Sequence, residues 1–165
     1  MTDAFGPGSH VLYQDFVVPT GSALLSFSLF IGNRANAFST PVSLDFSTPA
    51  LNQQARVDIL KASADSFSVA AADVLQNVYQ THVGDPLLSG YSNLNFDLTS
   101  LFSANAGQTL RLRFAETDNV FTFQMGVDNV SLETTAVPEP SFPILFATSL
   151  AGLVAIRRHR RLGGL

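Results

Sequence analysis

Apolar and polar residues alternate along most of the chain between residues 11 and 132. In the clearest run, Leu110, Leu112 and Phe114 are separated by single residues that would face the other way. A period of two is that of a β-strand with one buried face, because successive side chains point to opposite faces of a sheet. Similar runs cover residues 12–18, 23–31, 42–46, 55–61, 91–98, 109–116 and 121–132. Seven or eight short strands with turns between them predict an all-β fold, an antiparallel β-sandwich of Ig-like or jelly-roll type.

In the last run, the apolar positions switch from odd to even residue numbers. Phe121, Phe123, Met125 and Val127 share one parity, whereas Val130 and Leu132 share the other. One extra residue in a strand reverses the facing of everything after it, so a β-bulge near residue 126 would return both sets to the core.

One segment in the middle of the chain is ambiguous. From Asp65 to Thr81, apolar residues also recur at helical spacing, and Asp65 is a suitable helix cap. The sequence leaves a helix possible there, before Gly84-Asp85-Pro86 breaks the chain.

The charge and cysteine content narrow the classes of function. Only 13% of the residues are charged, against about 25% in typical domains. Thirteen acidic residues stand against five basic ones up to residue 156, which disfavours nucleic acid or an anionic membrane as a partner of the domain. There is no cysteine, which excludes disulfides, thiolate catalysis and cysteine metal sites.

The C-terminal tail has three physically different parts. Val137, Pro138, Glu139 and Pro140 come first, followed by sixteen uncharged residues, 141–156. Sixteen helical residues span roughly 24 Å, enough for one short transmembrane helix if flanking arginines extend to the headgroups of a core about 30 Å thick. The arginines that follow would hold the C-terminal end in the cytoplasm and place everything before residue 137 outside it; they are Arg157, Arg158, Arg160 and Arg161.

The order Pro-Glu-Pro, short apolar helix, arginine cluster closely resembles the PEP-CTERM sorting signal of Gram-negative bacteria that make exopolysaccharide. The resemblance implies recognition of Pro138, Glu139 and Pro140 by an exosortase, a membrane-embedded cysteine protease that processes the protein near this motif. Residues 141–156 would be a transient membrane anchor, and the arginines would stop transfer across the membrane. A plain tail anchor and a buried core helix are the alternatives.

These features divide the chain into an extracytoplasmic β-sandwich domain, residues 1–136, and a sorting tail, residues 137–165. Met1 to Gly21 has neither the basic nor the apolar region of a secretory signal. An exported domain needs such a signal, so we expect the natural protein to have an N-terminal signal, and a first strand, that this sequence lacks.

The domain also resembles the cargo domains attached to PEP-CTERM tails and jelly-roll carbohydrate-binding modules. The similar stretches are YQDFVVP (13–19), LNQQARVDIL (51–60), FDLTSLFSANAGQTLRLRFAETDN (96–119) and GVDNVSLE (126–133). In such modules an aspartate on the last strand often helps hold a structural Ca²⁺. The resemblance therefore makes Asp128 a possible calcium ligand, and the alternative is that its carboxylate caps local N–H groups.

No catalytic constellation is recognisable in the sequence. His10 and His82 have no serine or acid at a motif spacing, and Glu116 with Asp118 is better interpreted as the polar end of a strand and a turn. We expect a non-enzymatic, structural, adhesive or glycan-binding protein of the outer envelope or exopolysaccharide matrix, anchored in the inner membrane during sorting. A secreted matrix hydrolase and an uncleaved membrane-anchored periplasmic protein are the rivals. The sequence does not select ligand residues among the tyrosines that could stack on a sugar, Tyr13, Tyr79 and Tyr91.

Overall fold

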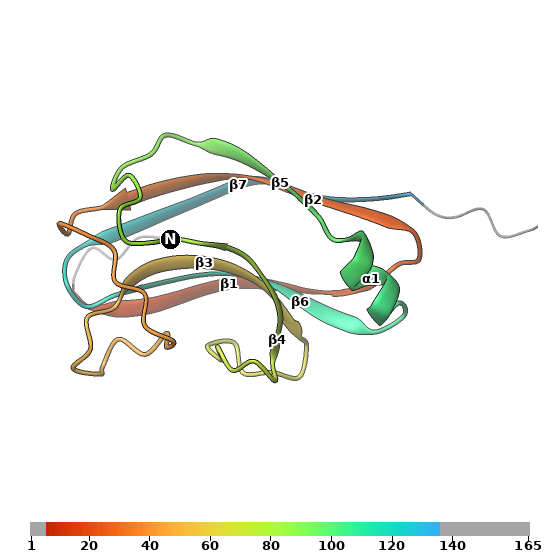
Figure 1. The fold of residues 1–165 in the computed structure, drawn as a ribbon, viewed down its shortest axis with the longest axis horizontal. Coiled ribbons are helices and arrows are strands. Elements are labelled where there is room, and N and C mark those ends of the chain that lie inside the picture. The colour runs from red at the N-terminus through yellow and green to blue at the C-terminus, as the bar shows by residue number, and fades with distance from the viewer. Residues whose placement is uncertain (1–5, 136–165) are drawn as a thin grey trace, which may run out of the picture. The chain divides into compact units, whose positions relative to one another are not determined.

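The computed structural model describes residues 6–135. Within this part the elements are, in order, β1 (Gly8–Val17), β2 (Ser22–Asn33), β3 (Gln53–Lys61), β4 (Val74–Gln80), β5 (Ser92–Asp97), α1 (Thr99–Asn105), β6 (Thr109–Asp118) and β7 (Phe123–Thr135). The strands form a four-stranded sheet, β1-β6-β3-β4, and a three-stranded sheet, β5-β2-β7, and all pairings are antiparallel. Figure 1 shows the sheets as two layers with α1 at one end. The predicted antiparallel β-sandwich is confirmed.

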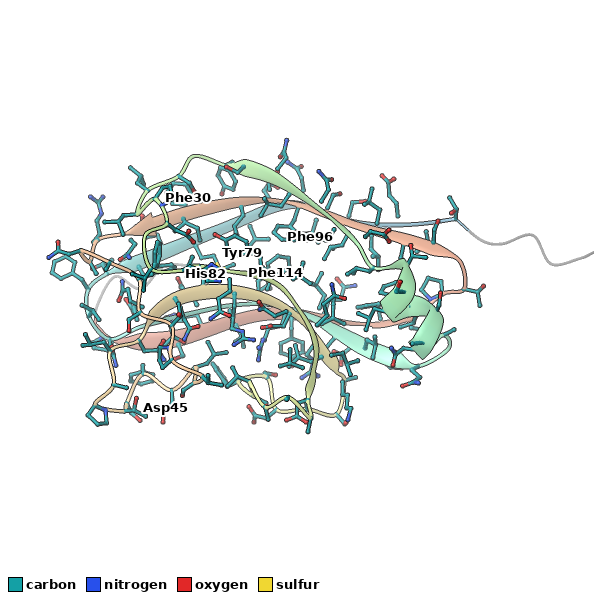
Figure 2. All side chains as sticks on the ribbon, in the orientation of Figure 1. Phe30, Asp45, Tyr79, His82, Phe96 and Phe114 are labelled. Carbon is teal, nitrogen blue, oxygen red and sulfur yellow. The ribbon has the colours of Figure 1, made fainter. Side chains whose placement is uncertain are left out.

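Alternate side chains of the central strands fill the space between the two layers. Leu25, Phe27 and Leu29 of β2 are at most 3% exposed. The Phe27 ring stacks on Phe96 of its own sheet, with centroids 5.6 Å apart, and meets Phe114 of the opposite sheet edge-on at 5.2 Å. Figure 2 shows Phe96 and Phe114 in the space between the layers. The alternation in the sequence therefore identifies the inner face correctly along β2 and β6.

The strand expected at residues 42–46 is wrong, because this segment is a loop. The Ser43 hydroxyl accepts a hydrogen bond from the backbone N–H of Asp45, and the Asp45 carboxylate accepts one from that of Ser47. Such local side-chain bonds replace those of a sheet ladder. Leu44 is buried while Val42, two residues earlier, is 85% exposed, so the two do not share one face as they would in a strand.

The helix left open between residues 65 and 81 is also wrong. The Asp65 carboxylate accepts a hydrogen bond from the N–H of Phe67, within a series of turns, and the segment then forms β4. Pairing with β3 satisfies the backbone groups of β4 that face this strand, and the β-branched Val74 and Val78 suit a strand. The spacing of apolar residues within one segment cannot show that another strand offers an edge for it to pair with.

The helix α1 was not expected from the sequence. The Asp97 carboxylate accepts a hydrogen bond from the backbone N–H of Thr99 at the start of the helix, and Gly107, with φ of +78°, lies just after its end. Phe102 is fully buried and its ring lies 5.6 Å from that of Phe16. With only seven residues, the helix is too short for its period to be recognised.

The predicted bulge in the last strand is present, a few residues later than expected. The register between β2 and β7 shifts between Ser26 and Ser28, and Asn129, on the facing part of β7, has φ of +51°. Leu132 packs against the core as predicted. Val130 does not, because it is 46% exposed, and neither does Phe121, which lies before β7 and is 61% exposed.

Two loop segments, residues 38–52 and 62–73, cover the outer face of the four-stranded sheet. The Arg113 guanidinium of β6 donates to the carbonyl oxygens of Ser66 (2.8 Å) and Ser68 (2.7 Å). The Gln54 side chain of β3 donates to the carbonyl oxygen of Ser43 at 2.9 Å. These contacts bury polar side chains that would otherwise face solvent, so this side of the sandwich is not an open sheet surface.

No helix within residues 6–135 is both long and apolar enough to cross a membrane. The predicted membrane helix 141–156, the Pro-Glu-Pro motif and the arginine cluster lie outside the described residues.

Candidate functional site: the outer face of the three-stranded sheet

The outer face of the three-stranded sheet carries hydroxyl and amide side chains. Because Leu25, Phe27 and Leu29 point into the core, the alternate residues of β2 point outward. The register places outward residues of β5 and β7 beside them. We call this surface the polar face; it comprises Ser26, Ser28 and Phe30 of β2, Asn93 and Asn95 of β5, Asp128, Asn129 and Ser131 of β7, and Tyr91 just before β5.

An aromatic side chain lies across one end of the polar face. The Tyr91 and Phe30 rings have centroids 5.8 Å apart and are tilted by 40°, and Tyr91 is 60% exposed. The Tyr91 hydroxyl reaches the backbone of β7 at Gly126, where an added Cβ would lie 2.5 Å from that oxygen. The absence of a side chain at Gly126 therefore lets the exposed ring rest on the sheet.

Hydrogen bonds between neighbouring strands order the middle of the polar face. The Ser28 hydroxyl donates to the Asn93 side-chain oxygen at 2.7 Å, and the Asn129 amide donates to the Ser28 hydroxyl at 3.4 Å. The bulge aims Asn129 at β2, and the Asp128 carboxylate accepts a hydrogen bond from the Asn129 backbone N–H at 2.7 Å. The amide nitrogen of Asn93 and the amide oxygen of Asn129 are not used in these bonds, so the row still presents donor and acceptor groups to a ligand.

The charged groups bordering the polar face are acidic. Asp97 of β5 and Glu133 of β7 flank Leu24 of β2, and Asp128 pairs with Ser28. The Thr99 hydroxyl and backbone N–H hydrogen-bond to Asp97 and lower the pKa of its carboxyl group. None of the outward residues in the paired rows of this sheet is lysine or arginine. The surface therefore suits ligands with many hydroxyl groups and no negative charge.

The structure places the possible calcium ligand, Asp128, on this face. Within residues 6–135, no group of three or more His, Asp or Glu side chains is arranged to hold a metal ion. Asp128 has the capping contact that the alternative reading predicted. Calcium binding at Asp128 remains a prediction.

The acids and histidines considered for catalysis lie in two separate places. His10 Nδ1 lies 3.4 Å from Glu116 Oε1, and Glu116 and Asp118 are at most 4% exposed. The Asp118 carboxylate accepts hydrogen bonds from the backbone N–H groups of Gly8 and Phe123. His82 lies in the loop after β4, where its backbone N–H donates to the Asp85 carboxylate. Asp118 has the turn role that the sequence predicted. The burial of Glu116 and Asp118 was not predicted.

The sequence did not identify the polar face. Tyr91, Phe30 and Gly126 are far apart along the chain and meet only because β2 lies between β5 and β7. The one local signal is the run of serines and asparagines at every second position of β2 and β5, which indicates an outward face without indicating a ligand.

The architecture defines the class of this protein as an all-β, two-sheet antiparallel sandwich of four and three strands. No model of a known protein family, no curated protein and no solved structure matches the chain.

Proposed function

We propose that this chain is an exported, non-enzymatic protein of the bacterial envelope or exopolysaccharide matrix, sorted by an exosortase and binding neutral glycan through the polar face. The sorting part of the proposal is supported by the tail, where Pro138, Glu139 and Pro140 precede an apolar segment and an arginine cluster. The sandwich, of jelly-roll type, would be the cargo, and residues 141–156 its transient membrane helix.

The observation that carries the glycan part is the exposed Tyr91 ring resting on the sheet beside a row of amides and hydroxyls. Sugar rings present an apolar C–H face and a rim of hydroxyl groups. An aromatic ring packs against such a face at low entropic cost, since few rotatable bonds become fixed. Asn93 and Asn129 side chains can both donate to and accept from vicinal hydroxyls.

The test is affinity gel electrophoresis of the full-length chain in gels containing a soluble neutral glucan, galactan or mannan. Replacing Tyr91 with Ala removes the stacking ring, and we expect about tenfold weaker retention, equivalent to about 1.4 kcal/mol. Gly126→Ala keeps Tyr91 but places a methyl group where its hydroxyl lies, so it should weaken retention as well.

Tyr13→Ala is the matched control. Tyr13 is 48% exposed, and its ring lies 4.1 Å from the Arg111 guanidinium of the other sheet. We expect this variant to be retained like the wild type. Two results would contradict the glycan assignment. In the first, no neutral polysaccharide retards the wild-type protein. In the second, the Tyr91→Ala variant is retarded as strongly as the wild type. Release of sugar from any of the gels' polysaccharides would favour the hydrolase instead.

A further inference from the structure

A hollow lies on the side of the sandwich where β4 and β5 are the sheet edges. The two strands belong to different sheets, and the connection between them, residues 81–91, crosses from one layer to the other. Hydrogen bonds hold this connection to the end of β2. The backbone N–H of Ser89 donates to the Ile31 carbonyl oxygen, and the Ser89 hydroxyl accepts a hydrogen bond from the Ile31 N–H. The backbone N–H of Asn33 donates to the Leu87 carbonyl oxygen. The connection is therefore a fixed wall.

The hollow, which we call the edge pocket, has a volume of about 290 Å³. This is at the lower end of the range for small-molecule sites, roughly 300–1,000 Å³. Leu29, Ile31 and Phe38, all buried core residues, contribute an apolar part of its lining. The other lining residues come from β4, the connection and β5; they are Tyr79, Thr81, Asp85, Pro86, Ser89, Ser92 and Leu94. A pocket of this size fits a single small ring.

Three polar groups of the edge pocket come from different elements. Figure 2 shows Tyr79 in the space between the layers. No hydrogen bond to another described residue engages the Tyr79 hydroxyl or the Ser92 hydroxyl. The Asp85 carboxylate accepts the N–H of His82 through Oδ2, which leaves Oδ1 as an acceptor. Burial and the nearby charge of Asp85 raise the pKa of Tyr79, so its hydroxyl keeps its proton and can donate.

We infer that the edge pocket binds one neutral pyranose ring, a monosaccharide or the terminal residue of a glycan. The C–H face of the ring would pack on Pro86 and Leu94, the apolar lining residues that are not fully buried. Its hydroxyl groups would donate to Asp85 and exchange hydrogen bonds with Tyr79 and Ser92, and bonds to the ionised carboxylate are the stronger ones. The same carboxylate disfavours a sugar that carries its own negative charge, because like charges repel at short range.

This inference stands apart from the glycan site proposed on the polar face. Tyr91 and Ser92 are neighbours in sequence, but Tyr91 packs on Phe30 over the outer face while Ser92 lines the edge pocket. Variants can therefore remove one site and leave the other, and the two proposals can fail separately.

The experiment is an NMR titration of the full-length chain with the methyl pyranosides of glucose, galactose and mannose, and separately with methyl glucuronide, into the tens of millimolar range. We expect saturable shifts at pocket residues with at least one neutral pyranoside, and at least tenfold weaker binding of methyl glucuronide. Tyr79→Phe removes only the hydroxyl and should weaken the neutral ligand several-fold. Asp85→Asn should weaken it as well and should reduce the preference over the glucuronide.

Two controls test the location. Tyr13→Phe removes a phenol hydroxyl on the other sheet, and Tyr91→Ala removes the ring on the polar face; both should bind the neutral pyranoside like the wild type. The absence of saturable shifts with all three neutral pyranosides would overturn the inference. So would binding that a folded Tyr79→Phe and a folded Asp85→Asn both leave unchanged, or binding that Tyr91→Ala abolishes.

Discussion

Replacing Asp58 with Asn should destabilise the domain more than any surface change, because the Asp58 carboxylate is paired with two buried arginines. Asp58 and Arg113 are fully buried and Arg56 is 7% exposed. Asp58 Oδ1 accepts hydrogen bonds from Arg56 Nη2 and Asn77 Nδ2, each at 2.7 Å, and Oδ2 accepts from Arg56 Nε at 2.7 Å and from Arg113 Nη2. The cluster ties β3, β4 and β6 together under the covering loop 62–73.

The magnitude follows from these four bonds. An amide at position 58 keeps one acceptor oxygen and turns its NH₂ group toward two of the four donors. Hydrogen bonds to charged groups contribute about 1.5–3 kcal/mol each, and breaking a buried ion pair by removing one partner costs about 3–5 kcal/mol. We therefore expect Asp58→Asn to lower the free energy of unfolding by about 3–5 kcal/mol, a large part of the roughly 5–15 kcal/mol typical of a domain.

The pH dependence provides a second readout. Burial by itself would raise the pKa of Asp58, but hydrogen bonds and charges from Arg56 and Arg113 outweigh it and hold the pKa below its ordinary value. A carboxyl group whose pKa is lower in the folded state stabilises the fold above its unfolded pKa, about 3.9, and loses this contribution as the pH falls through the folded value. The difference between wild type and Asp58→Asn should therefore be constant near neutral pH and shrink below about pH 4.

The assay is urea unfolding of the full-length chain from pH 3 to pH 7. Glu133→Gln removes a charge from an exposed position of β7 and should stay within about 0.5 kcal/mol of the wild type. A loss below about 1 kcal/mol for Asp58→Asn at pH 7, or a difference that does not shrink in acid, would refute the electrostatic argument.

Three further predictions concern calcium, the tail and the core. If Asp128 binds Ca²⁺, the ion at a hundredfold excess over Kd should stabilise the wild type by about 2.7 kcal/mol relative to EGTA and leave Asp128→Ala unchanged; equal melting of the wild type in both buffers would remove the metal hypothesis. In the native host, the intact mass of the mature protein should lack residues 157–165, and a mature form that retains them would count against sorting by an exosortase. Phe102→Ala should lower the free energy of unfolding by about 3–5 kcal/mol because it empties a fully buried site, whereas the exposed Ser103→Ala should change it little; similar urea midpoints for the two would contradict the role given to α1.

The sequence alone determined the fold class and the inner face of the central strands. Along the middle of β2 and the start of β6 every second residue is a large apolar one, and a period of two leaves one face to be buried. The phase change near the end of the chain likewise implied a bulge, since a strand cannot otherwise keep both Met125 and Leu132 in one core. These inferences succeeded because they depend on the two-residue period of a strand and on which side chains are apolar, and both are local properties of the sequence.

Only the tertiary structure decided where the polar residues lie and what they contact. The alternation assigned Arg113 to the outer face of its strand, which is correct, but could not show that the loop 62–73 covers that face and makes the charge a buried one. Nor could it show that Gly126 leaves space for Tyr91, or that Tyr79 and Ser92 line one pocket. The physical reason is that burial, desolvation and ligand geometry depend on segments distant in sequence, and these meet only when the two sheets pair and pack.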